Sequence, residues 1–162
     1  MPDFATVPLL LVEDDERDAL LLESAFRTLN FSNPLFTVIS AARAIEYLDG
    51  EGLYANRGEF PLPYLVLLDS DLADAGNVLR FIRQTPSLKH LFVVALTSSE
   101  PDHAAADAHE LGADSYLLKP GDHANVEELL QLLRKHWLVL DRIIEFRREM
   151  ANTEARSSTA LS

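Results

Sequence analysis

Residues 64–71 read Tyr-Leu-Val-Leu-Leu-Asp-Ser-Asp, and they say more about the fold than any other part of the sequence. Its five consecutive apolar residues are too few for an independent helix and too uniformly apolar for a half-exposed strand, so they predict a strand buried on both faces. In open parallel α/β sheets the ligand crevice lies outside the carboxyl ends of such strands. Asp69 follows the strand directly, so it is placed either for chemistry or simply to start a turn.

Apolar strands and amphipathic helices alternate on both sides of this stretch. We expect the other strands at 7–12, 35–39, 91–96 and 115–118, and helices at 15–30, 41–49, 76–85, 101–111 and from 122–125 onward. Ser40 and Ser99 are the expected N-caps, and Gly50 and Gly112 the expected helix ends. Five strands alternating with five helices predict a single doubly wound α/β sheet.

The composition fits a globular α/β domain and excludes several classes of protein. A net charge of -12 over 162 residues argues against a nucleic-acid-binding surface, which needs clustered Lys and Arg. The chain has no cysteine, so disulfides and thiolate metal sites are excluded. It lacks the pattern of a signal peptide and an apolar run near the ~18 residues of a membrane span, so we expect a cytoplasmic protein.

The last predicted helix is longer than one sheet can cover. We expect one domain over 1–138, a helical extension over 139–150, and a disordered tail over 151–162, where the residues are small, polar and rich in Ser and Thr. Apolar residues beyond the covered part of the helix need another surface. We therefore predict a homodimer that buries Trp137, Leu140, Ile143, Ile144 and Phe146.

Charged and hydroxyl side chains stand where four of the predicted strands end, and in a parallel sheet these ends share one rim. They are Glu13, Asp14, Asp69, Thr97 and Lys119. Carboxylates gathered without Cys or His ligands favour a hard divalent cation, Mg²⁺ or Mn²⁺. A lysine ammonium and a threonine hydroxyl suit the oxygens of a phosphoryl group. The set therefore predicts a phosphoryl-transfer site that forms an acyl phosphate on a carboxylate.

The chain resembles the receiver domain of response regulators in two-component signalling. The resemblance covers about residues 7–137 and rests on four segments in order: Leu-Leu-Val-Glu-Asp-Asp at 10–15, Leu-Val-Leu-Leu-Asp at 65–69, Val-Val-Ala-Leu-Thr-Ser at 93–98, and Gly-Ala-Asp-Ser-Tyr-Leu-Leu-Lys-Pro at 112–120. It implies a flavodoxin-like five-stranded parallel sheet with strand order 2-1-3-4-5.

The resemblance also implies chemical roles at the rim. Asp69 would accept a phosphoryl group from a sensor histidine kinase, and Lys119 would pair with the phosphoryl oxygens. Mg²⁺, with Mn²⁺ as a substitute, would be held by oxygens of Glu13, Asp14, Asp69 and the main-chain carbonyl of Asp71. The protein would then be a signalling switch rather than an enzyme, with self-phosphorylation and autodephosphorylation as its only reactions.

A conformational switch is implied as well. Thr97 would move toward the phosphoryl group and Tyr116 would turn inward, which changes the protein-contact surface near the fourth helix and fifth strand. The Lys119–Pro120 bond would be a cis peptide. The chain departs from receivers at 72–76, where it lacks their usual Pro-Gly pair. The sequence therefore does not fix where the third helix begins.

The long loop at 51–63, the Leu-Lys-His-Leu segment before the fourth strand and the tryptophan in the last helix resemble single-domain receivers that work with bacterial phytochrome-type kinases. Two alternatives remain. A haloacid-dehalogenase-type phosphatase could use Asp69 and Asp71, although that family carries the motif near the N-terminus. A degenerate receiver could keep the fold without being phosphorylated, although every group that the chemistry needs is present.

Overall fold

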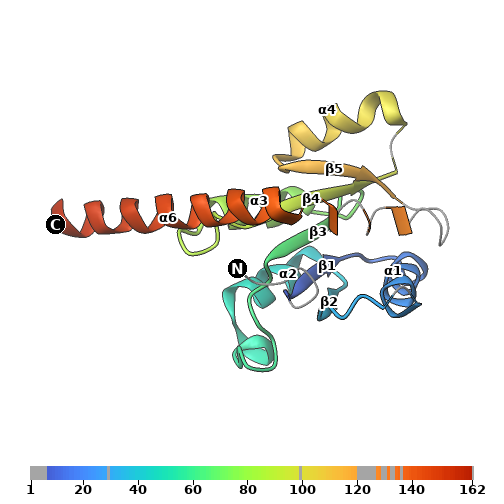
Figure 1. Cartoon of the computed structure of the whole chain (residues 1–162), viewed down its shortest axis with the longest axis horizontal. Coiled ribbons are helices and arrows are strands. Elements are labelled where there is room, and N and C mark those ends of the chain that lie inside the picture. The colour runs from blue at the N-terminus through green and yellow to red at the C-terminus, as the bar shows by residue number, and fades with distance from the viewer. Residues whose placement is uncertain are drawn as a thin grey trace.

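A five-stranded parallel sheet forms the centre of the computed structural model, which describes residues 7–28, 30–98, 100–119, 127–128, 131, 134–135 and 137–161. The strands are β1 (Leu9–Val12), β2 (Leu35–Val38), β3 (Leu65–Asp69), β4 (Phe92–Thr97) and β5 (Ser115–Leu118). They lie in the order β2-β1-β3-β4-β5 (Figure 1). The predicted doubly wound, flavodoxin-like fold is therefore confirmed.

The first four helices begin and end close to where the sequence places them, whereas the last one continues past its predicted end at 150. The helices are α1 (Glu16–Thr28), α2 (Ala41–Asp49), α3 (Ala75–Gln84), α4 (Pro101–Leu111) and α6 (Trp137–Leu161), with a short 3-10 turn η2 (Gly52–Tyr54) in the long loop. The Ser40 side chain accepts a hydrogen bond from Arg43 N, and Gly50 and Gly112 adopt left-handed φ angles of 70° and 91° at helix ends. α4 follows Glu100, which makes no side-chain cap, and the expected cap Ser99 lies outside the described residues.

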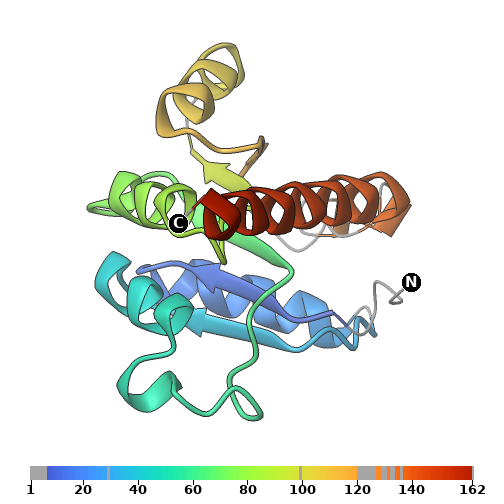
Figure 2. The same ribbon diagram turned by 90° about the vertical axis from the view of Figure 1, so that its left-hand side faces the viewer.

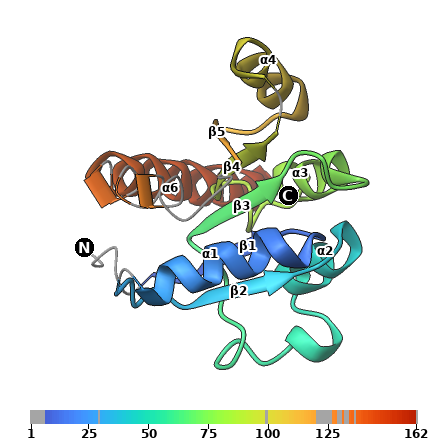
Figure 3. The same cartoon turned by 90° about the vertical axis from the view of Figure 1, so that its right-hand side faces the viewer.

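Two layers of helices cover the two faces of the sheet (Figures 2 and 3). Alternate residues of the central strands face a cluster with α1 and α6 on one side and a cluster with α2 and α3 on the other. All five residues of β3 are buried, as their unbroken apolar run predicts. The strand therefore has no solvent-facing side, and its final residue, Asp69, is held inside the protein at 1% exposure.

Helix α6 is part of the core, which corrects one predicted interface residue. Ile144 is completely buried among β1, β3, β4 and α1, and Ile143 packs partly against the same cluster. The assignment of Ile144 to a dimer surface is therefore wrong, because the sheet face beside α1 still needed a cover. Phe146 is 63% exposed, while the side chains of Trp137 and Leu140 lie outside the described part of the chain.

The prediction of a disordered tail from Ala151 is also wrong. α6 continues to Leu161, and Figure 1 shows it reaching past the end of the sheet. Residues 137–161 contain no glycine or proline that would end a helix. Glu154 also forms an ion pair with Lys89, which anchors the first part of the tail to the segment before β4. Among the described residues, no helix combines the length and the apolarity needed to cross a bilayer.

Asp114, in the turn before β5, ties α6 to the rest of the fold. Its Oδ2 accepts hydrogen bonds from Val93 N at 2.7 Å and from Arg83 Nη2 of α3 at 2.8 Å. Its Oδ1 lies 2.8 Å from Arg147 Nη2 of α6, and that arginine also lies over the ring of Phe92. One largely buried carboxylate thus joins α3, β4 and α6.

We predict that Asp114→Ala lowers the free energy of unfolding by about 1–3 kcal/mol, because it leaves a backbone N–H and two guanidinium groups without their acceptor. Denaturant unfolding followed by circular dichroism measures the change. Glu110→Ala, which removes an exposed acid from neighbouring α4, is the control. Equal stability of the two variants would show that the Asp114 contacts do not hold α6 in place.

Candidate metal and phosphoryl-transfer site

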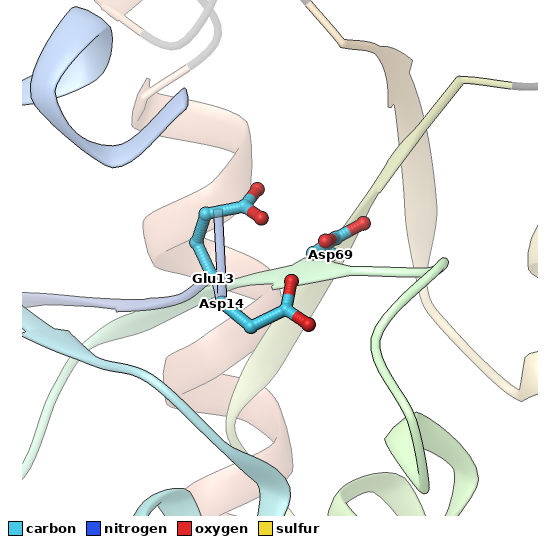
Figure 4. Close-up of side chains that lie close together, drawn as sticks. All are labelled: Glu13, Asp14 and Asp69. Atoms are coloured by element: carbon cyan, nitrogen blue, oxygen red, sulfur yellow. The ribbon is translucent and has the colours of Figure 1, made fainter. Parts of the chain in front are cut away.

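The ends of β1 and β3 bring three carboxylates together, as the sequence predicts. Figure 4 shows Glu13, Asp14 and Asp69 facing one space between the two strands. Carboxylate oxygens of the three residues lie within 4.8 Å of one another. Glu13 and Asp69 are each 1% exposed, whereas Asp14 is exposed to solvent. Two buried acids and one accessible acid thus form a cluster that opens at the rim of the sheet.

Backbone hydrogen bonds between neighbouring strands fix where these side chains begin. Glu13 N donates to Val38 O, Ser70 N to Leu96 O, and Lys119 N to Thr97 O at 2.7 Å. The parallel ladders therefore continue past the strand ends and hold the rim residues in register. Lys119, 106 residues after Glu13 in the chain, reaches the same site in this way.

The Lys119 ammonium group lies among carboxylates from three elements. Its Nζ is 3.1 Å from Glu13 Oε2, 3.2 Å from Asp69 Oδ2 and 2.8 Å from Asp18 Oδ2. Asp18, in the first turn of α1, was not singled out from the sequence. An acid four residues after Asp14, at the start of the following helix, was the available signal.

The electrostatics of the site raise two pKa values. Burial, together with the hydrogen bond to Asp69, raises the pKa of Glu13 to about 7. Burial alone would lower the pKa of Lys119, but its hydrogen bonds to Asp18 and Glu13 and the nearby charge of Asp69 raise it above the ordinary value. Near neutral pH, Lys119 is thus fully charged while Glu13 binds a proton for part of the time.

The donor set fits a hard divalent cation. Glu13 Oε2 is buried and, despite its 3.1 Å distance to Lys119 Nζ, accepts no hydrogen bond from the described residues. This oxygen therefore has a lone pair for a cation, and Asp14 and Asp69 offer further oxygens within 4.8 Å. Three carboxylates without a sulfur or imidazole ligand match Mg²⁺ and Mn²⁺.

The loop after Asp69 takes a course that the sequence left open. Leu72 N donates to Asp69 O, and Ala75 N donates to Leu72 O, so two tight turns follow the strand. Asp74 has a left-handed φ of 62° immediately before α3. An aspartate tolerates this conformation better than most residues, so α3 begins without a glycine at this position.

Asp71 contacts Asp69 through its backbone and Ser98 through its side chain. Its N–H donates to Asp69 Oδ1 at 2.9 Å, and its carboxylate accepts a hydrogen bond from Ser98 Oγ. The assignment of its main-chain carbonyl as a metal ligand stays a prediction. Ser70 and Asp71 line an open hollow together with Asp107, Glu110 and Leu111 of α4.

The predicted switch residues occupy different environments. Thr97, the last residue of β4, is 1% exposed beside the site, whereas Tyr116 on β5 is 38% exposed. In this structure Tyr116 is therefore in an outward position, from which the predicted inward movement would have to start. The proposed cis bond involves Pro120, which lies outside the described residues.

Comparisons with known proteins identify the family. No protein-family model matches the chain. The response regulator Rcp1 of Synechocystis is 32% identical over 132 residues, which are 80% of this chain and 88% of Rcp1. The solved structure of its Mn²⁺-bound form covers 82% of this chain and 94% of its own, at a TM-score of 0.65 and 31% identity.

Two further solved structures are similar over most of their length. A response regulator in red light signaling of R. palustris has a TM-score of 0.70 and 33% identity, with 81% of this chain and 93% of that chain covered. The phosphorylated cyanobacterial phytochrome response regulator RcpA has a TM-score of 0.69 and 28% identity, with 82% and 94% covered. None of these comparisons supports the phosphatase alternative. The chain belongs to the response regulator family, and its sheet, helices and acidic rim form a receiver domain.

Proposed function

We propose that Asp69 is the phosphoacceptor of this response regulator and that a histidine kinase supplies the phosphoryl group with the help of Mg²⁺. The observation that carries the proposal is the position of Asp69: a buried carboxylate, 3.2 Å from Lys119 Nζ and within 4.8 Å of Glu13 and Asp14. An acid beside one cation and two potential metal ligands is suited to hold the charge of a transferred phosphoryl group.

The geometry suggests which oxygen reacts. The Asp71 N–H holds Asp69 Oδ1, so Oδ2, on the side of Lys119, is the oxygen that would attack phosphorus. The new O–P bond forms as the N–P bond of the kinase phosphohistidine breaks, and the imidazole keeps the electron pair. Lys119 would stay with the phosphoryl oxygens, and the Thr97 hydroxyl at the adjacent strand end would donate to them.

A bound divalent ion would be held by Glu13, Asp14 and Asp69 and would neutralise charge that develops on the phosphoryl oxygens. The solved structure of the Mn²⁺-bound form of Rcp1 supports this proposal, because the Rcp1 chain in it is 31% identical to the present protein. Mg²⁺ is our choice of ion, since it takes the same oxygen ligands in phosphoryl-transfer sites. Autodephosphorylation would complete the cycle, and the protein would act as a switch rather than as an enzyme with turnover.

The kinase partner is proposed from the relatives. The names of RcpA and of the R. palustris protein refer to phytochrome and red light, so we propose a phytochrome-type histidine kinase as the partner. Because histidine kinases take their phosphoryl group from ATP, the protein would meet this partner in the cytoplasm.

A homodimer remains part of the proposal, on a surface corrected by the structure. Val139, Phe146 and Met150 of α6 are 59%, 63% and 48% exposed, and their spacing of seven and four residues puts them on one helix face. This α6 face would pack against the same face of a second copy, as expected of an isologous interface.

Phosphorylation is tested with acetyl phosphate and Mg²⁺. We expect one acid- and alkali-labile phosphoryl group per chain on wild-type protein and none on Asp69→Ala, measured by intact mass and by peptide mapping after borohydride reduction of the acyl phosphate. Asp71→Asn, which keeps the backbone N–H that orients Asp69, should still be labelled. Labelling that persists in Asp69→Ala would contradict the proposal, and multiple turnover of phosphate esters would support the phosphatase instead.

Metal binding should depend on pH. Because Glu13 has a pKa raised to about 7, a proton competes with the cation below that pH and no longer does above it. We expect the affinity for Mg²⁺ to rise about tenfold from about pH 6 to about pH 8. Calorimetric titration measures it, and Glu13→Gln should bind Mg²⁺ more weakly with little pH dependence. An affinity of the wild type that is flat across this range would contradict the role of Glu13.

Sedimentation tests the dimer. Phe146→Glu should shift the full-length chain toward monomer, because it places a charge in the proposed apolar contact. Leu53→Glu is the matched control, since Leu53 is also apolar and 68% exposed but lies on η2. Truncation is unsuitable because Ile144 belongs to the core. A wild-type chain that is monomeric throughout, or equal effects of both substitutions, would exclude this interface.

A further inference from the structure

Asp18 makes the shortest contact of the Lys119 ammonium group, although the phosphoryl-transfer chemistry proposed above assigns it no part. Its Oδ2 lies 2.8 Å from Nζ, compared with 3.1 Å for the nearer Glu13 oxygen and 3.2 Å for Asp69. It is also the only one of the three partners that comes from a helix: Glu13 and Asp69 stand at strand ends, while Asp18 is on α1.

Three acids surround the lysine. Its ammonium group has three N–H donors. It donates hydrogen bonds to Asp18 Oδ2 at 2.8 Å and to Glu13 Oε1 at 3.4 Å, and it forms an ion pair with Asp69 Oδ2 at 3.2 Å. A phosphoryl group on Asp69 would add further anionic oxygens in the same space. The Lys119 ammonium group can donate short hydrogen bonds to the phosphoryl oxygens only if one of its present carboxylate partners moves away.

Exposure decides which partner withdraws at the lowest cost. The side chains of Glu13 and Asp69 are 0% and 2% exposed, so either of them would become an unpaired buried charge without the lysine. The Asp18 side chain is 36% exposed and can exchange the ammonium group for water. Its backbone stays in place, because Asp18 N donates a hydrogen bond to Asp15 Oδ1 at the start of α1.

We propose that Asp18 is a displaceable partner of Lys119: it occupies the ammonium group in the unphosphorylated protein and gives it up when a phosphoryl group reaches Asp69. Asp18 is thus a positioning residue that acts through Lys119, and it lowers the affinity of the site for phosphoryl oxygens. Its departure also breaks the ion pair between the end of β5 and α1, so α1 reports the state of the site. This inference rests on the proposed phosphorylation of Asp69.

The test uses fluoroberyllate, which imitates a phosphoryl group on a carboxylate, with the full-length protein in saturating Mg²⁺. We expect Asp18→Asn to bind it about 3- to 10-fold more tightly than wild type, because the competing charge is gone while the side-chain shape is kept. Glu16→Gln is the matched control: it removes an exposed acid from the same first turn of α1, and it should change the affinity less than twofold.

Each outcome has a distinct meaning. An affinity of Asp18→Asn equal to that of Glu16→Gln would overturn the proposal, and so would weaker binding, since Asp18 would then orient Lys119 for the phosphoryl group instead of competing with it. Thermal unfolding of each variant without ligand separates a loss of stability from an effect on the site. If neither the wild type nor any variant binds fluoroberyllate, the proposed phosphorylation of Asp69 is contradicted, and the proposed role of Asp18 is contradicted as well.

Discussion

The ion cluster around Lys119 is the interaction on which the site depends. One ammonium group lies within 3.2 Å of carboxylates from β1, β3 and α1, and it compensates part of the repulsion among acids that burial would otherwise make costly. Burial, together with the hydrogen bond to Asp69, raises the pKa of Glu13. Three carboxylates and one ammonium group leave a net negative charge at the rim, which the proposed divalent cation would neutralise.

The fold supplies this cluster by a simple geometric rule. β1, β3 and β4 are buried on both faces, so their alignment is fixed by packing, and parallel ladders bring all carboxyl ends to one rim. Residues separated by more than 100 positions therefore meet within hydrogen-bonding distance. Away from the site, Asp114 and Ile144 fix α6 to the sheet. Three apolar residues of the same helix are exposed: Val139, Phe146 and Met150.

Much of this architecture could be predicted from the sequence, because unbroken apolar runs identify buried strands and the acids after them identify the rim. Glu13, Asp14, Asp69 and Lys119 were found in this way. Asp18 was missed because its partner is 101 positions away, and an acid in the first turn of a helix is ordinary. Ile144 was misplaced because helix periodicity does not say how much of a sheet remains uncovered. The helical end of α6 was missed because Ser/Thr-rich composition outweighed the absence of helix-breaking residues.

A crystal structure of the protein with Mg²⁺ and fluoroberyllate would test whether Asp69 accepts the phosphoryl group between the metal site and Lys119. We expect beryllium bonded to Asp69 Oδ2, a magnesium ion in contact with carboxylate oxygens of Glu13, Asp14 and Asp69, and Lys119 Nζ on a fluorine atom. Fluoroberyllate bound to Asp71 or to another acid, or a magnesium ion away from Glu13, Asp14 and Asp69, would contradict it.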